Sequence, residues 1–148
     1  MEQSILDFKN SVIFKIHHLV LLTDKLASKK LQESVGLSLS QFLLLSMLQC
    51  PLAANQKQIA HWLGVSEVAV SKQIEQLEKL DLIEKQENQP DRKQKFWQLT
   101  PKGQDKFQSA IVIMNNLSEQ WQSFLEQAEL HLLHQVIDKL LLKMQTNN

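Results

Sequence analysis

The sequence predicts a mainly α-helical protein that contains one small β-hairpin. Only three glycines and three prolines occur in 148 residues, and long segments without either residue are typical of helices. Apolar residues recur at steps of three and four over most of the chain, whereas between Leu82 and Leu99 they alternate with polar ones. This change of period predicts a short hairpin within an otherwise helical fold.

Two helices are expected in the first third of the chain. The first runs from about Ser4 to Val35, and Gly36 favours a left-handed turn at its end. Ser38 begins the second helix, because Gln41 follows it at the spacing of a capping box. Pro51 ends this helix.

Two shorter helices follow, separated by a tight turn. Asn55 and Gln58 form another capping-box pattern before the segment QKQIAHWL. That helix ends at Gly64, and Ser66 caps the next one. The second of these helices has one apolar face, which we expect to be buried, formed by Val70, Ile74 and Leu77.

The segments LIEKQE and KFWQL predict the strands of the hairpin, with the polar turn NQPDRKQ between them. Trp97 and Leu99 are expected on one side of the hairpin. Thr100 and Pro101 begin another helix, since Thr is a good cap and Pro is tolerated at the first helical position. The remaining residues predict two helices separated near residues 123–126.

Helix, turn, helix and hairpin in this order predict a winged helix-turn-helix. In that arrangement the second helix enters the major groove of DNA and presents its outward side chains to base edges. Its Gln residues suit adenine, whereas Glu67 suits either cytosine or the positive end of its own helix. The expected DNA-binding residues on this helix are Ser66, Glu67, Val68, Ala69, Ser71, Lys72, Gln73 and Gln76.

Arg92, at the tip of the hairpin, is the single arginine of the chain. A guanidinium is attracted to the negative potential of a minor groove, so the tip is a second expected DNA contact. Lys93 is a competing candidate for the same role. The alternative is that both belong to a solvated cluster of charges.

The overall charge argues against strong non-specific DNA binding. The net charge of the chain is zero, and residues 56–103 carry eight Lys and Arg against seven Asp and Glu. Non-specific affinity for DNA should therefore be modest. With one cysteine, no basic leader and short apolar runs, a soluble cytoplasmic protein is expected. We expect no enzymatic activity, because no catalytic motif is evident.

Three segments together resemble the MarR family of bacterial regulators. They are GLSLSQFLLL, QIAHWLGVSEVAVSKQIEQLEKLDLIEK and PDRKQKFWQLTPKG, the last of which is similar to the family's wing signature. The resemblance implies a winged core, a homodimer formed by the terminal helices and palindromic operator DNA. It also implies release by a small effector, often phenolic or lipophilic.

Two positions depart from the family pattern. Asp81 stands where glycine is usual between the second helix and the wing, although Asp tolerates a left-handed backbone better than most residues. Lys93 replaces the second wing arginine and lacks a planar guanidinium.

Other candidate sites are weaker. Cys50 has no second cysteine with which to pair and is expected to be structural. His17, His18, His131 and His134 lack an evident completing ligand, so no metal or other cofactor is expected. By position, the resemblance implies that His17, Leu21 and Met47 line an effector pocket, although packing explains each of them equally well.

We therefore expect a single domain over 1–148, with a DNA-binding core at 38–103 and dimerisation helices at 1–35 and 104–148. The last helix carries leucines over much of its circumference, which requires burial on more than one side. The expected function is a ligand-responsive regulator, most simply a repressor. The alternative is a winged-helix module that binds protein rather than DNA, which would suit the neutral charge.

Overall fold

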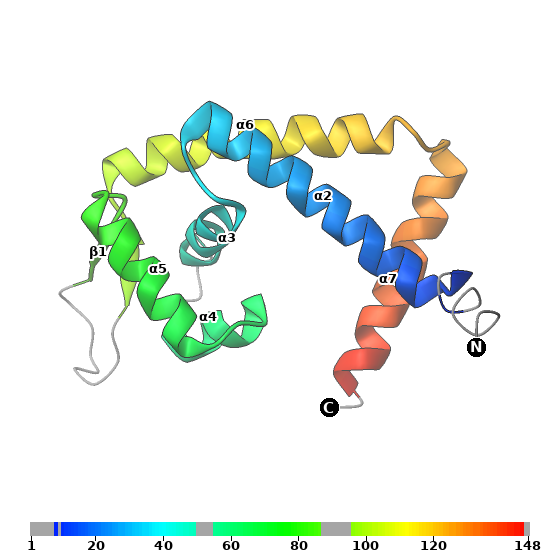
Figure 1. Ribbon diagram of the computed structural model, residues 1–148, viewed down its shortest axis with the longest axis horizontal. Helices are drawn as coiled ribbons and strands as arrows, with labels where there is room; N and C mark the ends of the chain where they lie inside the picture. Colours follow the sequence, from blue (N-terminus) through cyan, green and yellow to red (C-terminus); the bar gives the residue numbers. More distant parts are fainter. Residues whose placement is uncertain (1–7, 9, 50–54, 87–95, 147–148) are drawn as a thin grey trace. The chain divides into compact units, whose positions relative to one another are not determined.

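The structure, a computed structural model, describes residues 8, 10–49, 55–86 and 96–146. Its main elements in chain order are α2 (Val12–Val35), α3 (Leu39–Leu48), α4 (Gln56–Leu63), α5 (Glu67–Lys79), β1 (Ile83–Lys85), β2 (Trp97–Leu99), α6 (Pro101–Gln122) and α7 (Gln127–Thr146) (Figure 1). The chain forms two compact units, Met1–Ile113 and Met114–Asn148. The mainly helical fold with a small hairpin is confirmed.

The first helix differs from its prediction at its beginning. The expected continuous helix from Ser4 is interrupted at Ser11, whose backbone is extended and whose side chain accepts a hydrogen bond from the Phe14 amide (3.2 Å). An N-cap at this position starts a new helix, because it satisfies a backbone donor that would otherwise have no partner. The predicted end at Gly36 is confirmed, with φ 65°.

The predicted caps of the next three helices are confirmed. Ser38 with Gln41 and Asn55 with Gln58 form complete capping boxes at the beginnings of α3 and α4. Gly64 ends α4 with φ 64°, and the Ser66 hydroxyl accepts from the Ala69 amide at the beginning of α5. The expected end of α3 at Pro51 lies outside the described residues.

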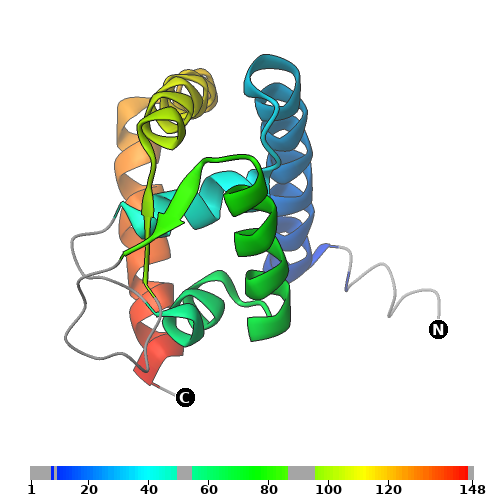
Figure 2. The same ribbon diagram turned by 90° about the vertical axis from the view of Figure 1, so that its left-hand side faces the viewer.

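The core of the first unit lies among α2, α3, α4, α5, the hairpin and the first turns of α6. Figure 2 shows α3 behind α5 and the two strands. The predicted inward face of α5 is confirmed, since its three apolar residues are buried, and the Phe42 and Phe107 rings stack with centroids 5.7 Å apart. The largest fully buried side chains are Leu31, Leu37, Leu44, Leu45, Ile59, Val70, Leu77 and Leu82.

The hairpin pairs β1 with β2 in antiparallel register, with Glu84 opposite Gln98. Trp97 is buried, Leu99 is half-buried and Gln98 is exposed, as the alternation predicts. The tip of the hairpin, which includes Arg92 and Lys93, lies outside the described residues.

Thr100 connects the hairpin to α6 and is only 5% exposed. Its hydroxyl donates to the Asp81 carbonyl (2.7 Å) and accepts from the Gly103 amide (3.0 Å), and its own amide donates to the Leu82 carbonyl (3.1 Å). A Cβ at Gly103 would lie 1.9 Å from the Leu82 oxygen. The absence of a side chain at Gly103 therefore lets the first turn of α6 approach the backbone between α5 and β1.

Two lysines in the first turns of α6 donate to the carbonyl ends of other helices. Lys102 Nζ donates to the Leu80 carbonyl at the end of α5, and Lys106 Nζ donates to the Val35 carbonyl at the end of α2, each over 2.7 Å. Both ammonium groups lie where a helix dipole is negative. This part of α6 is thereby attached to both helix ends.

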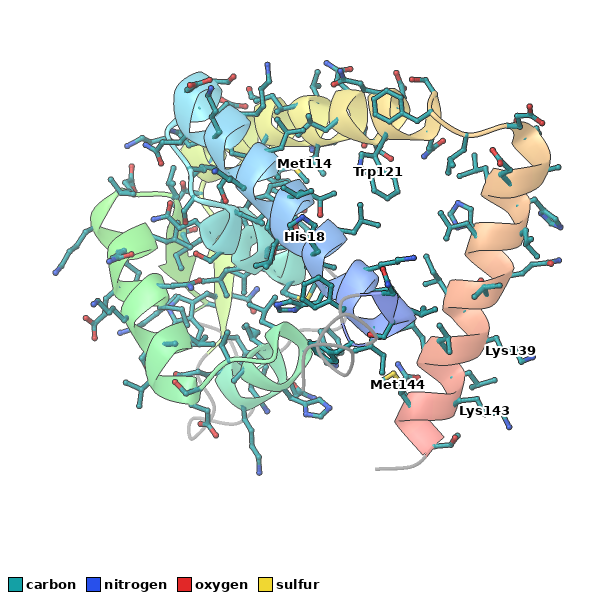
Figure 3. The ribbon with its side chains drawn as sticks, turned by 45° about the vertical axis from the view of Figure 1, so that its right-hand side comes forward. His18, Met114, Trp121, Lys139, Lys143 and Met144 are labelled. Carbon is teal, nitrogen blue, oxygen red and sulfur yellow. The ribbon has the colours of Figure 1, made fainter. Side chains whose placement is uncertain are left out.

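The second unit contains the end of α6 and all of α7, separated near residues 123–126 as predicted. No residue of α7 is buried in the single chain. In Figure 3 Lys139 and Lys143 point to one side of α7 and Met144 to another. None of the described helices has the length and apolar character that crossing a membrane requires.

Candidate nucleic-acid interface

The turn between α4 and α5 is fixed by the cap residues next to it and by contacts between the two helices. Gly64 and Ser66 end one helix and begin the other. At the far end of α4, the Gln56 side-chain amide donates to the Glu67 carbonyl (2.9 Å) and also contacts the Ser71 hydroxyl. The sequence did not indicate this contribution of Gln56, because it depends on how the two helices cross.

One long side of α5 faces away from the core. It lies opposite the buried residues Val70, Ile74 and Leu77, and all but one of its exposed side chains are polar or charged. The apolar side of such a helix packs in the core, and its polar side remains in water, where it can bind a partner. The exposed residues of α5 are Glu67, Val68, Lys72, Glu75, Gln76 and Lys79.

The expected DNA-binding set divides into two groups in the structure. Glu67, Val68, Lys72 and Gln76 are exposed, and Ser66 is exposed while its hydroxyl caps the helix. The half-buried residues are Ala69, Ser71 and Gln73.

Both polar residues of the half-buried group are turned partly toward the protein. Ser71 contacts Gln56, and the side-chain oxygen of Gln73 is buried without a hydrogen-bond partner in the part of the chain that the structure describes. Glu75 and Lys79 were absent from the expected set although they share the outer side with Val68. Seven and eleven residues separate them from Val68 in the sequence, and this helical spacing could have identified them.

A hydrogen bond connects the end of α5 to the hairpin. The Trp97 indole Nε1–H donates to Glu78 Oε1 (2.9 Å), and Gln98 Nε2 donates to Glu84 Oε1 (2.8 Å) across the strands. A buried indole N–H normally needs a partner. The carboxylate of Glu78 provides this partner and fixes the base of the hairpin against α5.

The expected effector residues do not define a cavity by themselves. His17 and Leu21 are exposed one turn apart on α2, whereas Met47 is half-buried on α3. Cys50 lies outside the described residues. Within residues 8, 10–49, 55–86 and 96–146, no three His, Cys, Asp or Glu side chains gather as metal ligands. His131 instead pairs with Gln135 (3.0 Å).

Residues 37–95 match the model of the MarR family. This range contains α3, α4, α5 and β1. A comparison with curated proteins finds no match.

Solved structures share the fold over most of the chain. A MarR/EmrR family transcriptional regulator from Acinetobacter sp. ADP1 is 22% identical, with a TM-score of 0.80 over 90% of this chain and 94% of that one. MepR of S. aureus, solved in complex with DNA, is 20% identical, with a TM-score of 0.79 over 90% and 98%. The transcriptional repressor CouR, bound to a 23-mer DNA duplex, is 18% identical, with a TM-score of 0.79 over 90% and 94%. Residues 37–95 of this chain therefore match the MarR family, and the chain shares its fold with these solved proteins.

Proposed function

We propose that this protein is a transcription regulator that binds double-stranded DNA through α5. The observation that carries the proposal is the exposed polar side of α5, held in a helix-turn-helix by the Gly64 turn and the Gln56 contacts. A helix in this arrangement fits the major groove. The DNA complexes of MepR and CouR support the same use of the fold. Arg92 and Lys93 are proposed as the contribution of the hairpin tip.

We further propose a homodimer that recognises a palindromic operator. The DNA-binding core spans 38–103, and the segments 1–35 and 104–148 supply the dimerisation helices. Large apolar side chains exposed along α7 support this assignment, because soluble monomers rarely expose extended apolar surfaces. Two-fold symmetry would place half-site centres about 10 bp apart. Repression is the simplest outcome of such binding, and the repressor CouR has the same fold.

A gel-shift series tests DNA binding directly. Purified protein is offered the DNA upstream of its own gene and duplexes selected from a random pool. We expect a sequence-specific complex, weakened by roughly 1–3 kcal/mol in Lys72→Ala because Lys72 is exposed on the outer side of α5. Lys30→Ala, an exposed lysine on α2 outside the helix-turn-helix, is the matched control and should bind as wild type does, because alanine introduces no charge into the proposed dimer.

Two results would contradict the proposal. If Lys72→Ala binds as tightly as wild type, α5 is not the DNA surface. If no duplex is retained at all, the neutral charge of the chain favours the alternative, a winged-helix module that binds protein.

A small lipophilic or phenolic effector is proposed to release the DNA, in the cytoplasm and without enzymatic turnover. Its proposed contacts are His17, Leu21 and Met47. A thermal-shift screen of lipophilic acids and phenols, followed by release of the gel-shift complex, tests this proposal. A compound that raises the melting temperature and leaves the complex intact binds the protein without being its inducer.

A further inference from the structure

Val68 is the apolar exception on the outer side of α5. Its side chain is 78% exposed. Every other exposed residue of this helix can donate or accept a hydrogen bond or carries a charge. Isolated exposed apolar residues are common on protein surfaces, so the meaning of Val68 depends on its place in the fold.

That place is the first turn of α5, where the backbone is fixed from two directions. The Ser66 hydroxyl accepts from the Ala69 amide (3.2 Å), and the Gln56 side chain donates to the Glu67 carbonyl (2.9 Å). The position of the Val68 side chain is therefore determined before anything binds. A fixed side chain loses little freedom on binding.

The fold itself gains nothing evident from valine at this position. Val68 points away from the core, on the side opposite Val70 and Ile74. A β-branched side chain is also less favourable in a helix than alanine. Valine here exposes apolar surface to water and lowers helix propensity slightly. We therefore expect its benefit to come from contact with a binding partner.

The major groove of DNA offers one apolar group to such a side chain. Adenine, guanine and cytosine present only hydrogen-bonding groups there, whereas thymine adds its C5-methyl group. The branched methyl groups of valine match it in size and polarity. Lys72 and Gln76, one and two turns further along the same side, offer hydrogen bonds to guanine or phosphate and to adenine.

We propose that Val68 recognises the C5-methyl group of a thymine in each operator half-site. This inference rests on the proposed function, and it adds the identity of one base and the atom that is read. The contact is purely apolar, so it distinguishes thymine from bases with the same hydrogen-bonding groups but no methyl group.

The replacement of thymine by uracil tests this contact, since uracil lacks only the methyl group. Wild-type full-length protein selects its duplex from a random pool, and each thymine of one half-site is then replaced singly. At one position we expect affinity to fall about fourfold, the change that corresponds to the loss of about one buried methyl group. The other positions should change less.

Two variants assign the effect to Val68. Val68→Ala should show a clearly smaller difference between the thymine and uracil duplexes than wild type, because it loses both γ-methyl groups and keeps only the shorter Cβ. Val65→Ala removes a less exposed valine from the turn before α5 and should keep the fourfold preference. Val68→Ala should melt as wild type does or slightly higher, and Val65→Ala, which loses partly buried surface, should melt somewhat lower but remain folded at the temperature of the binding assay, which excludes misfolding as the cause.

The outcomes separate this inference from the proposed function. A selected duplex that binds tightly but shows no uracil-sensitive position overturns the role of Val68 and leaves DNA binding intact. A uracil effect of undiminished size in Val68→Ala also overturns it. If the pool yields no duplex, the proposed function and this inference both fall.

Discussion

Asp81 has a left-handed backbone, with φ 59°, and is the one non-glycine residue with positive φ among those described. It follows α5, and the hydrogen bonds of the turn surround it: its amide donates to the Glu78 carbonyl and the Leu82 amide to the Leu77 carbonyl (2.9 Å each). This pattern normally favours glycine at the central position. The expectation that Asp tolerates this conformation is confirmed.

Substitution at Asp81 isolates the backbone contribution to stability. Asp81→Ala should lower the free energy of unfolding by about 1 kcal/mol, because alanine lacks the short polar group that eases the left-handed conformation. Asp81→Asn should change it by less than about 0.5 kcal/mol. Both variants remove the same charge, so the difference between them in urea denaturation reports the backbone term. Equal losses would mean that the charge, and not the conformation, matters.

The burial of individual residues in α5 could be predicted from the sequence only in part. Val70, Ile74 and Leu77 were assigned correctly to the core, because period and polarity agree there. Ser71 and Gln73 were expected to face outward but are half-buried at the edges of the helix. On polarity alone, a polar side chain is predicted to face water. Ser71 is instead half-buried, and its hydroxyl contacts Gln56, a residue of α4.

At the scale of elements, glycines at helix ends serve two different purposes. Gly64 has φ 64° and no atom within 4 Å of a Cβ position, so its requirement is conformational. Gly103 has no unusual φ, but a Cβ there would lie 1.9 Å from a backbone oxygen of Leu82. Glycine is required at position 103 because there is no room for a side chain.

Two alanine variants distinguish these purposes. Gly64→Ala should cost about 1 kcal/mol of unfolding free energy, from the left-handed backbone alone. Gly103→Ala should cost about 3 kcal/mol, since backbone atoms rather than a flexible side chain must shift. Chemical denaturation of both variants measures the difference. A smaller loss for Gly103→Ala than for Gly64→Ala would contradict the close approach of α6 to Leu82.

Element boundaries followed from sequence wherever a cap residue was unambiguous. The ends of α2 and α4 at glycine and the beginnings of α3, α4, α5 and α6 were all predicted from single residues. The beginning of α2 was not, because Ser11 lies inside an apolar repeat that continues on both sides of it. Periodicity does not show whether a serine caps a helix or lies within one, since both patterns keep the same spacing.

At the scale of the whole molecule, α7 leaves apolar surface without cover in the single chain. Leu140 is 46% exposed, and Leu132, Val136, Ile137, Leu141 and Leu142 are exposed as well. The sequence predicted this wide apolar surface. It could not reveal what covers the surface, because a single chain contains only one half of a two-fold interface.

The proposed homodimer predicts that Leu140→Asp yields monomeric or aggregated protein with little affinity for DNA. A charge within an interface of more than about 2,000 Å² remains unpaired when two copies associate. Lys139→Asp is the matched control, since Lys139 lies on a charged side of α7 (Figure 3) and should remain dimeric. Sedimentation at micromolar concentration measures both variants. A folded, monomeric wild type would contradict the proposal.

The buried Thr100 junction has a consequence for how the first unit opens. Its hydroxyl and amide join the connection after α5 to the beginning of α6, and the Gln104 amide adds a bond to the Thr100 carbonyl (2.8 Å). Separation of Thr100 from the Asp81 and Leu82 carbonyls also frees the hydroxyl that caps the first turn of α6, so the hairpin base and this turn should open as one cooperative unit. In deuterated water, the amide protons of Thr100 and Gly103 should then exchange at a common slow rate, well after those of the exposed outer side of the hairpin.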